Sequence, residues 1–82
     1  MTPDDLRALL FDKAGLPSGY AAAPVLGVPM RTVQHWLSGE RSISAGSAEL
    51  LCIALAAEGH IPAGRWMRQW VRPSICKMLG VS

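Results

Sequence analysis

The sequence predicts an all-α fold, a compact domain of five short helices. Apolar residues recur at the three- and four-residue spacing of helices, and no run alternates with the period of two that a strand requires. Capping residues and glycines follow one another at short intervals, as they do at helix starts and ends. The length of 82 residues allows one domain, and 50% hydrophobic with 17% charged residues excludes a disordered segment.

The first helix is expected from Pro3 to about Ala14. Thr2 can cap its start, Pro3 suits the first helical position, and Asp5 completes a capping-box pattern. Gly15 follows the last helical residue, where a glycine commonly ends a helix.

The second helix is expected from Ser18, as its cap, to Leu26. Pro24 lies inside this span and removes one backbone donor, so we expect a helix that is short or kinked, or that starts later. Gly27 ends it.

Pro29 then opens a third helix, Met30 to Leu37, and Gly39 caps its end. Val33 and Trp36 fall on one side of this helix at helical spacing. Polar residues fall largely on the other side, which predicts one buried and one exposed face.

A fourth helix is expected to begin after Ser44 or Ser47 and to run to about Glu58. Its apolar residues cover more than half of the circumference, so burial on nearly all sides is expected. A fifth helix is expected from Pro62 to about Arg72. Pro73 ends or kinks it, and a last turn follows.

Residues 18–39 carry the pattern of a helix-turn-helix. Ala23 is small enough for two helices to cross closely, and Gly27 supplies the positive φ that a tight turn between them needs. Val33 and Trp36 anchor the second helix of the pair on the first. The residues left on its outward face are Met30, Arg31, Gln34 and His35.

The run from Ala23 through Leu26-Gly27-Val28 to Gly39 resembles the XRE/Cro-like family, the lambda-repressor-like helix-turn-helix domains. The resemblance covers residues 3–58 as a layout and is specific over 18–44. It implies a DNA-binding core over residues 1–60. Residues 61–82 then form a helical extension that packs on this core and is a candidate for dimerisation.

The resemblance also implies which residues touch double-stranded DNA. Met30 and Arg31 map to base-reading positions, and Gln34 and His35, one turn later, map to base or phosphate contacts. Arg31 is the strongest base reader, since a guanidinium matches guanine O6 and N7. The residues that map to phosphate contacts are Ser18, Ser38, Arg41 and Ser42. The chain departs from the family pattern at Gly19, Pro24 and Pro29, and these departures concern affinity more than fold.

Net charge is +2, and the positive charge is concentrated after residue 60, where four basic residues stand without an acid. Arg65, Arg68 and Arg72 recur as one helical stripe, which is either a basic patch for phosphate or an acidic partner, or the solvated face of a helix. The apolar residues proposed as a dimer contact are Trp66, Trp70, Ile75 and Met78. The alternative is that the two tryptophans close the hydrophobic core.

Nothing in the sequence indicates an enzyme. Cys52, Cys76, His35 and His60 lack the paired spacings of zinc sites, and the glycines form no phosphate loop, so no metal and no cofactor are expected. No stretch is long and apolar enough to span a membrane, and two distant cysteines favour a cytoplasmic protein.

These observations predict a sequence-specific DNA-binding regulator of transcription, a repressor of phage or bacterial type. It would bind an inverted repeat as a homodimer through residues 30–37. The alternative is a protein-binding module on the same scaffold, such as a phage-encoded inhibitor, an antitoxin-like protein or an RNA-polymerase modulator with a host protein as partner.

Overall fold

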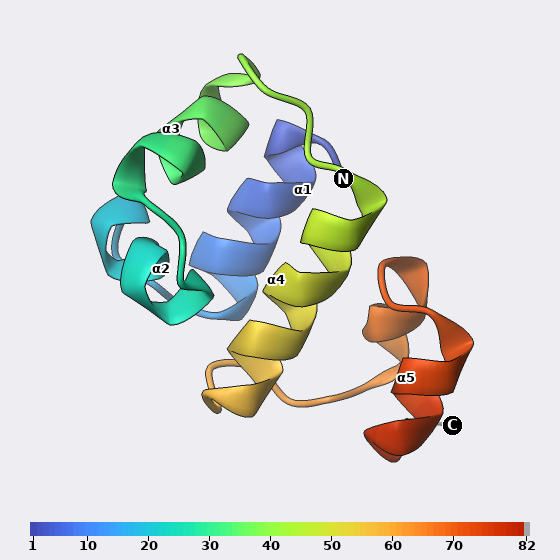
Figure 1. The fold of residues 1–82 in the computed structure, drawn as a ribbon. Coiled ribbons are helices and arrows are strands. Elements are labelled where there is room, and N and C mark those ends of the chain that lie inside the picture. Colours follow the sequence, from blue (N-terminus) through green and yellow to red (C-terminus); the bar gives the residue numbers. More distant parts are fainter. Residues whose placement is uncertain (82) are drawn as a thin grey trace.

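The computed structural model describes residues 1–81, and all regular secondary structure within them is helical (Figure 1). This confirms the all-α fold class. The elements in chain order are α1 (Pro3–Arg7), the π-helix η1 (Ala8–Lys13), α2 (Gly19–Leu26), α3 (Met30–Ser38), α4 (Ala45–Ala57), the 3-10 helix η2 (Arg65–Gln69) and α5 (Pro73–Met78). The molecule measures 33 × 22 × 19 Å along its principal axes.

The first predicted helix is present, with a change of winding along it. Its capping box is formed, since the Thr2 hydroxyl accepts from Asp5 N at 3.1 Å and the Asp5 carboxylate accepts from Thr2 N at 2.9 Å. From Ala8 the helix continues as the π-helix η1, where Ala14 N donates to Leu9 O, five residues back. The predicted helix is therefore present, with a π-helical stretch over residues 8–13.

The second and third helices lie where the sequence places them. The Ser18 hydroxyl caps α2, and Pro24 lies exposed inside this helix of 8 residues. Gly27 ends α2 with a φ of +68°, and Gly39 ends α3 with a φ of +85°. Both glycines hold the left-handed conformation that a side chain disfavours.

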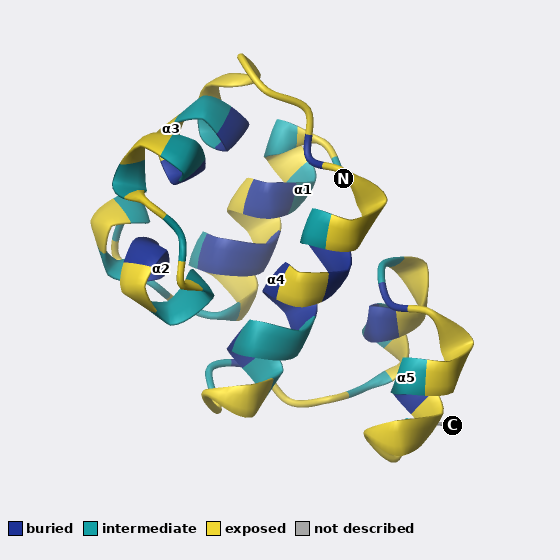
Figure 2. Ribbon diagram, in the orientation of Figure 1, coloured by how far each residue is buried: buried dark blue, intermediate teal, exposed yellow. Residues whose placement is uncertain are grey.

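The fourth helix begins after Ser44, whose hydroxyl accepts from Ser47 N at 3.1 Å. Its inner side is buried in the middle of the molecule, against α2 and the C-terminal residues. Leu50, however, is 67% exposed, and Figure 2 shows exposed residues along α4. The prediction of burial on nearly all sides was wrong, because so short a chain has too few elements to surround a helix.

The fifth helix differs most from its prediction. Residues 61–64 form a loop, a short 3-10 helix follows, and Pro73 begins α5, which corresponds to the last turn expected after it. Pro73 favours an extended conformation in the residue before it, and Arg72 has a ψ of 150°. The prediction of one helix from Pro62 through Arg72 was therefore wrong.

One hydrophobic core joins the N-terminal helices to residues 61–81, which we call the C-terminal unit. Within this core, Leu6, Leu10 and Leu55 of the N-terminal helices are fully buried, and so is Met67 of the C-terminal unit. The other core residues are Leu9, Ala22, Trp36, Ile43, Ala48, Leu51, Cys52, Ile61, Val71 and Cys76. Within residues 1–81, no helix combines the length and the hydropathy needed to cross a bilayer.

Candidate nucleic-acid interface

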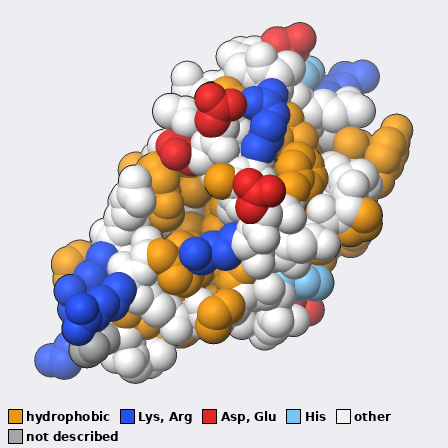
Figure 3. Space-filling view, turned by 180° about the vertical axis from the view of Figure 1, so that it is seen from behind, with side chains coloured by type: hydrophobic (Ala, Val, Ile, Leu, Met, Phe, Trp, Pro, Cys, Tyr) orange, Lys and Arg blue, Asp and Glu red, His pale blue; other side chains and the backbone are white. Residues whose placement is uncertain are grey.

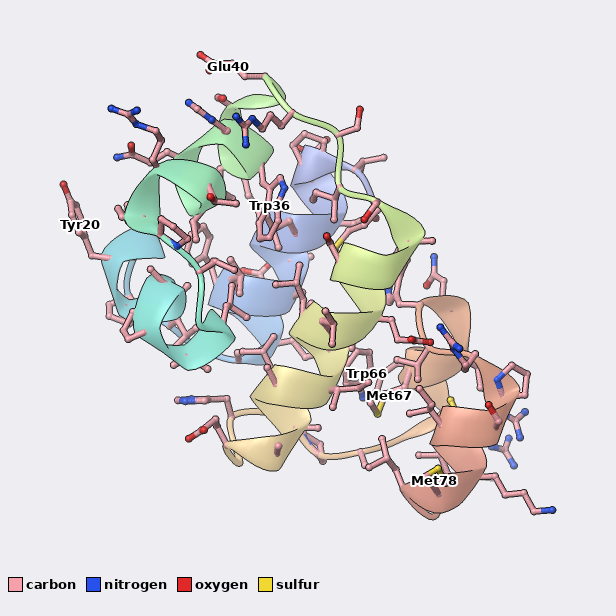
Figure 4. All side chains as sticks on the ribbon, in the orientation of Figure 1. Tyr20, Trp36, Glu40, Trp66, Met67 and Met78 are labelled. Carbon is pink, nitrogen blue, oxygen red and sulfur yellow. The ribbon has the colours of Figure 1, made fainter. Side chains whose placement is uncertain are left out.

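The two helices α2 and α3 pack against each other across the turn at Gly27. Ala23 of α2 is buried, and Val28 N donates to Ala23 O across the turn at 3.2 Å. Val33 is fully buried and Trp36 is 8% exposed, so the inner side of α3 is fixed in the protein. Figure 4 shows Trp36 pointing from α3 toward the interior. The opposite side of α3 is left toward solvent.

The four predicted base readers divide into two pairs. Arg31 and Gln34 are exposed, whereas Met30 and His35 are half-buried. The Nε2 atom of His35 lies 3.3 Å from a carboxylate oxygen of Glu40, and its Nδ1 atom is buried without a hydrogen-bond partner. His35 is therefore held by its own chain, and Arg31 and Gln34 are the better placed to reach a ligand.

Met30 packs back onto the start of α2. A Cβ added at Gly19 would lie 3.2 Å from the Met30 methyl carbon and 3.5 Å from side-chain carbons of Val33 and Leu37. Gly19 thus lets the start of α2 approach α3 closely. This gives a packing reason for a glycine at this position.

Two of the four predicted phosphate contacts also have roles within the protein. The Ser18 hydroxyl caps α2 by accepting from Ala21 N at 3.4 Å. The Ser38 hydroxyl donates to His35 O at 3.2 Å and accepts from Glu40 N at 3.4 Å. Arg41 and Ser42 are exposed in the loop that follows α3.

Tyr20 is an exposed residue near α3 that the sequence did not lead us to expect as a contact residue. It lies in the first turn of α2, is 72% exposed, and points away from the body of the protein (Figure 4). The feature of the sequence that could have indicated its exposure is a large aromatic residue directly after Gly19, where the start of α2 meets α3. Tyr20, Arg31, Gln34 and Arg41 are exposed residues of α2, α3 and the loop after them, and we call them the α3 surface.

The predicted basic patch lies at the other end of the molecule, since α3 and α5 occupy opposite ends in Figure 1. Arg65 and Arg68 are exposed. Arg72 donates from its backbone N and its Nε to one carboxylate oxygen of Glu49, both at 2.9 Å. These hydrogen bonds lower the pKa of Glu49 and raise that of Arg72. Although no acid follows residue 60 in the sequence, Arg72 is paired, because α4 supplies Glu49.

The predicted dimer residues are mostly packed against the protein itself. Trp66, Trp70 and Ile75 are half-buried against the core, and Trp66 Nε1 donates to Pro62 O at 2.9 Å. Met78 is 84% exposed. This arrangement agrees with the alternative, in which the two tryptophans close the core.

Comparison with known proteins adds no further assignment. No family model, no curated protein and no solved structure matches this chain. The likeness of residues 18–44 to lambda-repressor-like domains therefore stays a prediction from the motif.

The titratable side chains offer little for metal or thiol chemistry. Within residues 1–81, no three His, Cys, Asp or Glu side chains are grouped so that they could hold a metal ion. Cys52 and Cys76 are buried, and burial raises the pKa of Cys52 to about 12, with a smaller contribution from Cys76. A thiol with so high a pKa is a packing group at neutral pH.

Proposed function

We propose that this protein binds double-stranded DNA by placing α3 in the major groove. The observation that carries this proposal is the division of α3 into two faces. Val33 and Trp36 fix its inner face in the core, and Arg31 and Gln34 stand exposed on the outer one. A helix held in this way beside a glycine turn is the element that helix-turn-helix proteins insert between phosphate backbones.

The exposed residues suit two chemically distinct parts of a duplex, the base edges and the phosphates. The Arg31 guanidinium matches guanine O6 and N7, and the Gln34 amide matches adenine N6 and N7. Arg41 and Ser42, in the loop after α3, supply a charge and a hydroxyl for phosphate oxygens. Tyr20 adds a hydroxyl donor at the start of α2, where a phosphate backbone would pass.

We infer that the protein acts as a regulator of transcription, a repressor that occupies an inverted repeat as a dimer. Two copies related by a two-fold axis would place their α3 helices in successive major grooves, about 34 Å apart. Of the four residues predicted for the dimer contact, Met78 is the exposed one.

Selection of bound duplexes from a random pool tests this function directly. We expect a palindromic consensus, with affinity that falls steeply as salt concentration rises. Failure to enrich any sequence, together with no retention of duplex DNA at low ionic strength, would contradict the proposal.

A second candidate function is binding of another protein through the same surface. It is favoured by the large exposed side chain of Tyr20 and by Glu40, which places a negative charge beside His35. Arg31→Glu and the salt dependence of binding distinguish the two functions, whereas Tyr20→Ala would weaken both. Arg31→Glu would abolish DNA retention, whereas a protein complex centred on Tyr20 would persist at high salt and be lost in Tyr20→Ala.

A further inference from the structure

A hollow of about 450 Å³ lies between the first helix (α1 and η1) and the 3-10 helix η2. It is lined among others by Asp5, Leu9, Asp12, Lys13, Trp66 and Trp70. Figure 3 shows this side of the molecule, where an apolar area is bordered by acidic and basic side chains. The volume falls in the range of small-molecule sites, roughly 300–1,000 Å³.

Two carboxylates and one ammonium group surround this hollow, so its charge is negative overall. Asp5 is ionised at neutral pH, and hydrogen bonds from Thr2 lower its pKa further below the usual value. Asp12 is exposed at the rim. Such a site attracts a positively charged ligand and repels an anion.

The aromatic wall of the hollow already faces a cation. The Lys13 Nζ lies 5.0 Å from the centre of the Trp66 ring, within the distance at which the face of an indole attracts a positive charge. The ring itself is fixed, since Trp66 Nε1 donates to Pro62 O at 2.9 Å. Lys13 is exposed and its side chain is flexible, so a second cation can displace it.

We propose that this hollow binds small organic cations that carry an alkylated ammonium or a guanidinium group. The charged group would lie against the face of Trp66 and near Asp12, and its apolar part would contact Leu9 and Trp70. The lining residues come from the first helix, from η2 and from Trp70 directly after it, and none comes from α2 or α3. Binding here can therefore be tested separately from binding of DNA.

Binding can be followed at individual residues, because each of the three tryptophans gives one indole N–H signal in a proton–nitrogen NMR spectrum. Titration with tetramethylammonium should shift the signals of Trp66 and Trp70 and leave that of buried Trp36 in place. A blocked Gly-Arg-Gly peptide tests whether a guanidinium on a side chain is accepted as well. The neutral isostere tert-butanol should shift neither signal at the same concentrations.

Two variants should change the affinity in opposite directions. Asp12→Asn removes a carboxylate and should weaken binding by about two- to five-fold, as expected for one partly solvated charge. Lys13→Ala removes the competing ammonium and should tighten binding by a similar factor. The matched controls are Glu58→Gln and Lys77→Ala, which remove exposed charges outside the hollow and should leave the affinity unchanged.

Three results would overturn the proposal: no shift at Trp66 and Trp70, equal shifts with the neutral isostere, or weaker binding in Lys13→Ala. The four variants alter exposed side chains, and a dispersed amide spectrum checks that each is folded.

Discussion

Arg7 in α1 donates a hydrogen bond from Nη2 to the backbone carbonyl of Leu37 in α3, with 2.6 Å between the two atoms. Its Nη1 donates to Asp4 at 2.9 Å, which orients the guanidinium. The last carbonyls of a helix lack partners within the helix, and Arg7 supplies one for α3. The first helix therefore positions the end of the helix that we propose enters DNA.

Replacing Arg7 with Met should destabilise the protein by about 0.5–1.5 kcal/mol, the usual net contribution of one hydrogen bond. The methionine keeps the aliphatic stem, so the loss reports on the guanidinium. The pair with Asp4 adds little, since both side chains are at least half exposed. Urea unfolding measures the change, with Arg65→Met as the control at an exposed arginine. Equal losses in both variants would show that the contact with Leu37 contributes nothing.

The contact between Glu49 and Arg72 should make stability depend on acid pH. The folded state lowers the pKa of Glu49 from its usual 4.5, so it binds fewer protons than the unfolded state. The stabilisation is therefore complete above about pH 4.5 and is lost as the pH falls through the lowered pKa. Glu49→Gln should be less stable near pH 7 and should lose less stability on acidification.

Urea midpoints between about pH 3 and pH 7 measure this difference. Some acid sensitivity should remain in Glu49→Gln, because the pKa of Asp5 is lowered as well. Parallel pH curves for the two proteins would contradict the assignment.

The helix starts and ends could be predicted from the sequence because they depend on neighbouring residues. Thr2, Ser18 and Ser44 cap helices through bonds to the residue three positions later, and Gly27 and Gly39 end them with their own φ. Such contacts are local, so the residue types alone indicate them.

The sequence did not indicate the structure where distant residues decide it. Arg72 was assigned to a basic stripe, and its partner Glu49 lies 23 positions earlier on another helix. The exposure of Leu50 depends on how many elements remain to cover α4, which no local pattern encodes. In the candidate interface, Arg31 could be predicted as exposed from its helical position. The contact of His35 with Glu40 depends on how the chain turns after Gly39.

The left-handed turn between α2 and α3 should tolerate a side chain poorly. No atom lies within 4 Å of a Cβ added at Gly27, so Gly27→Ala tests the φ of +68° alone and should cost about 1 kcal/mol. Gly46 is the matched control, since it lies in α4 with the same open space but a helical conformation. Gly46→Ala should stabilise the protein by up to about 1 kcal/mol. Thermal unfolding distinguishes the two signs, and a gain in Gly27→Ala would contradict the argument.

The two cysteines should be unreactive in the folded protein. Both are buried, and a pKa of about 12 leaves only about one Cys52 in ten thousand as thiolate at pH 8. Ellman's reagent should therefore label neither thiol without denaturant and both in guanidinium chloride. Rapid labelling of one thiol in native buffer would show instead that the C-terminal unit opens away from α4.

Arg31→Ala should relax the choice of one base pair in each half-site, at a cost of about 1–3 kcal/mol on the preferred sequence. The guanidinium is exposed near the start of α3, so its loss removes a base contact and leaves the buried face of the helix unchanged. Binding to the selected duplex and to single-base variants of it measures the effect. Arg68→Ala is the matched control, because it removes the same charge from an exposed residue of η2, in the C-terminal unit. An equal loss on all duplexes would reassign Arg31 to a phosphate contact. An equal loss in Arg68→Ala would show that general charge, and not the α3 surface, governs binding.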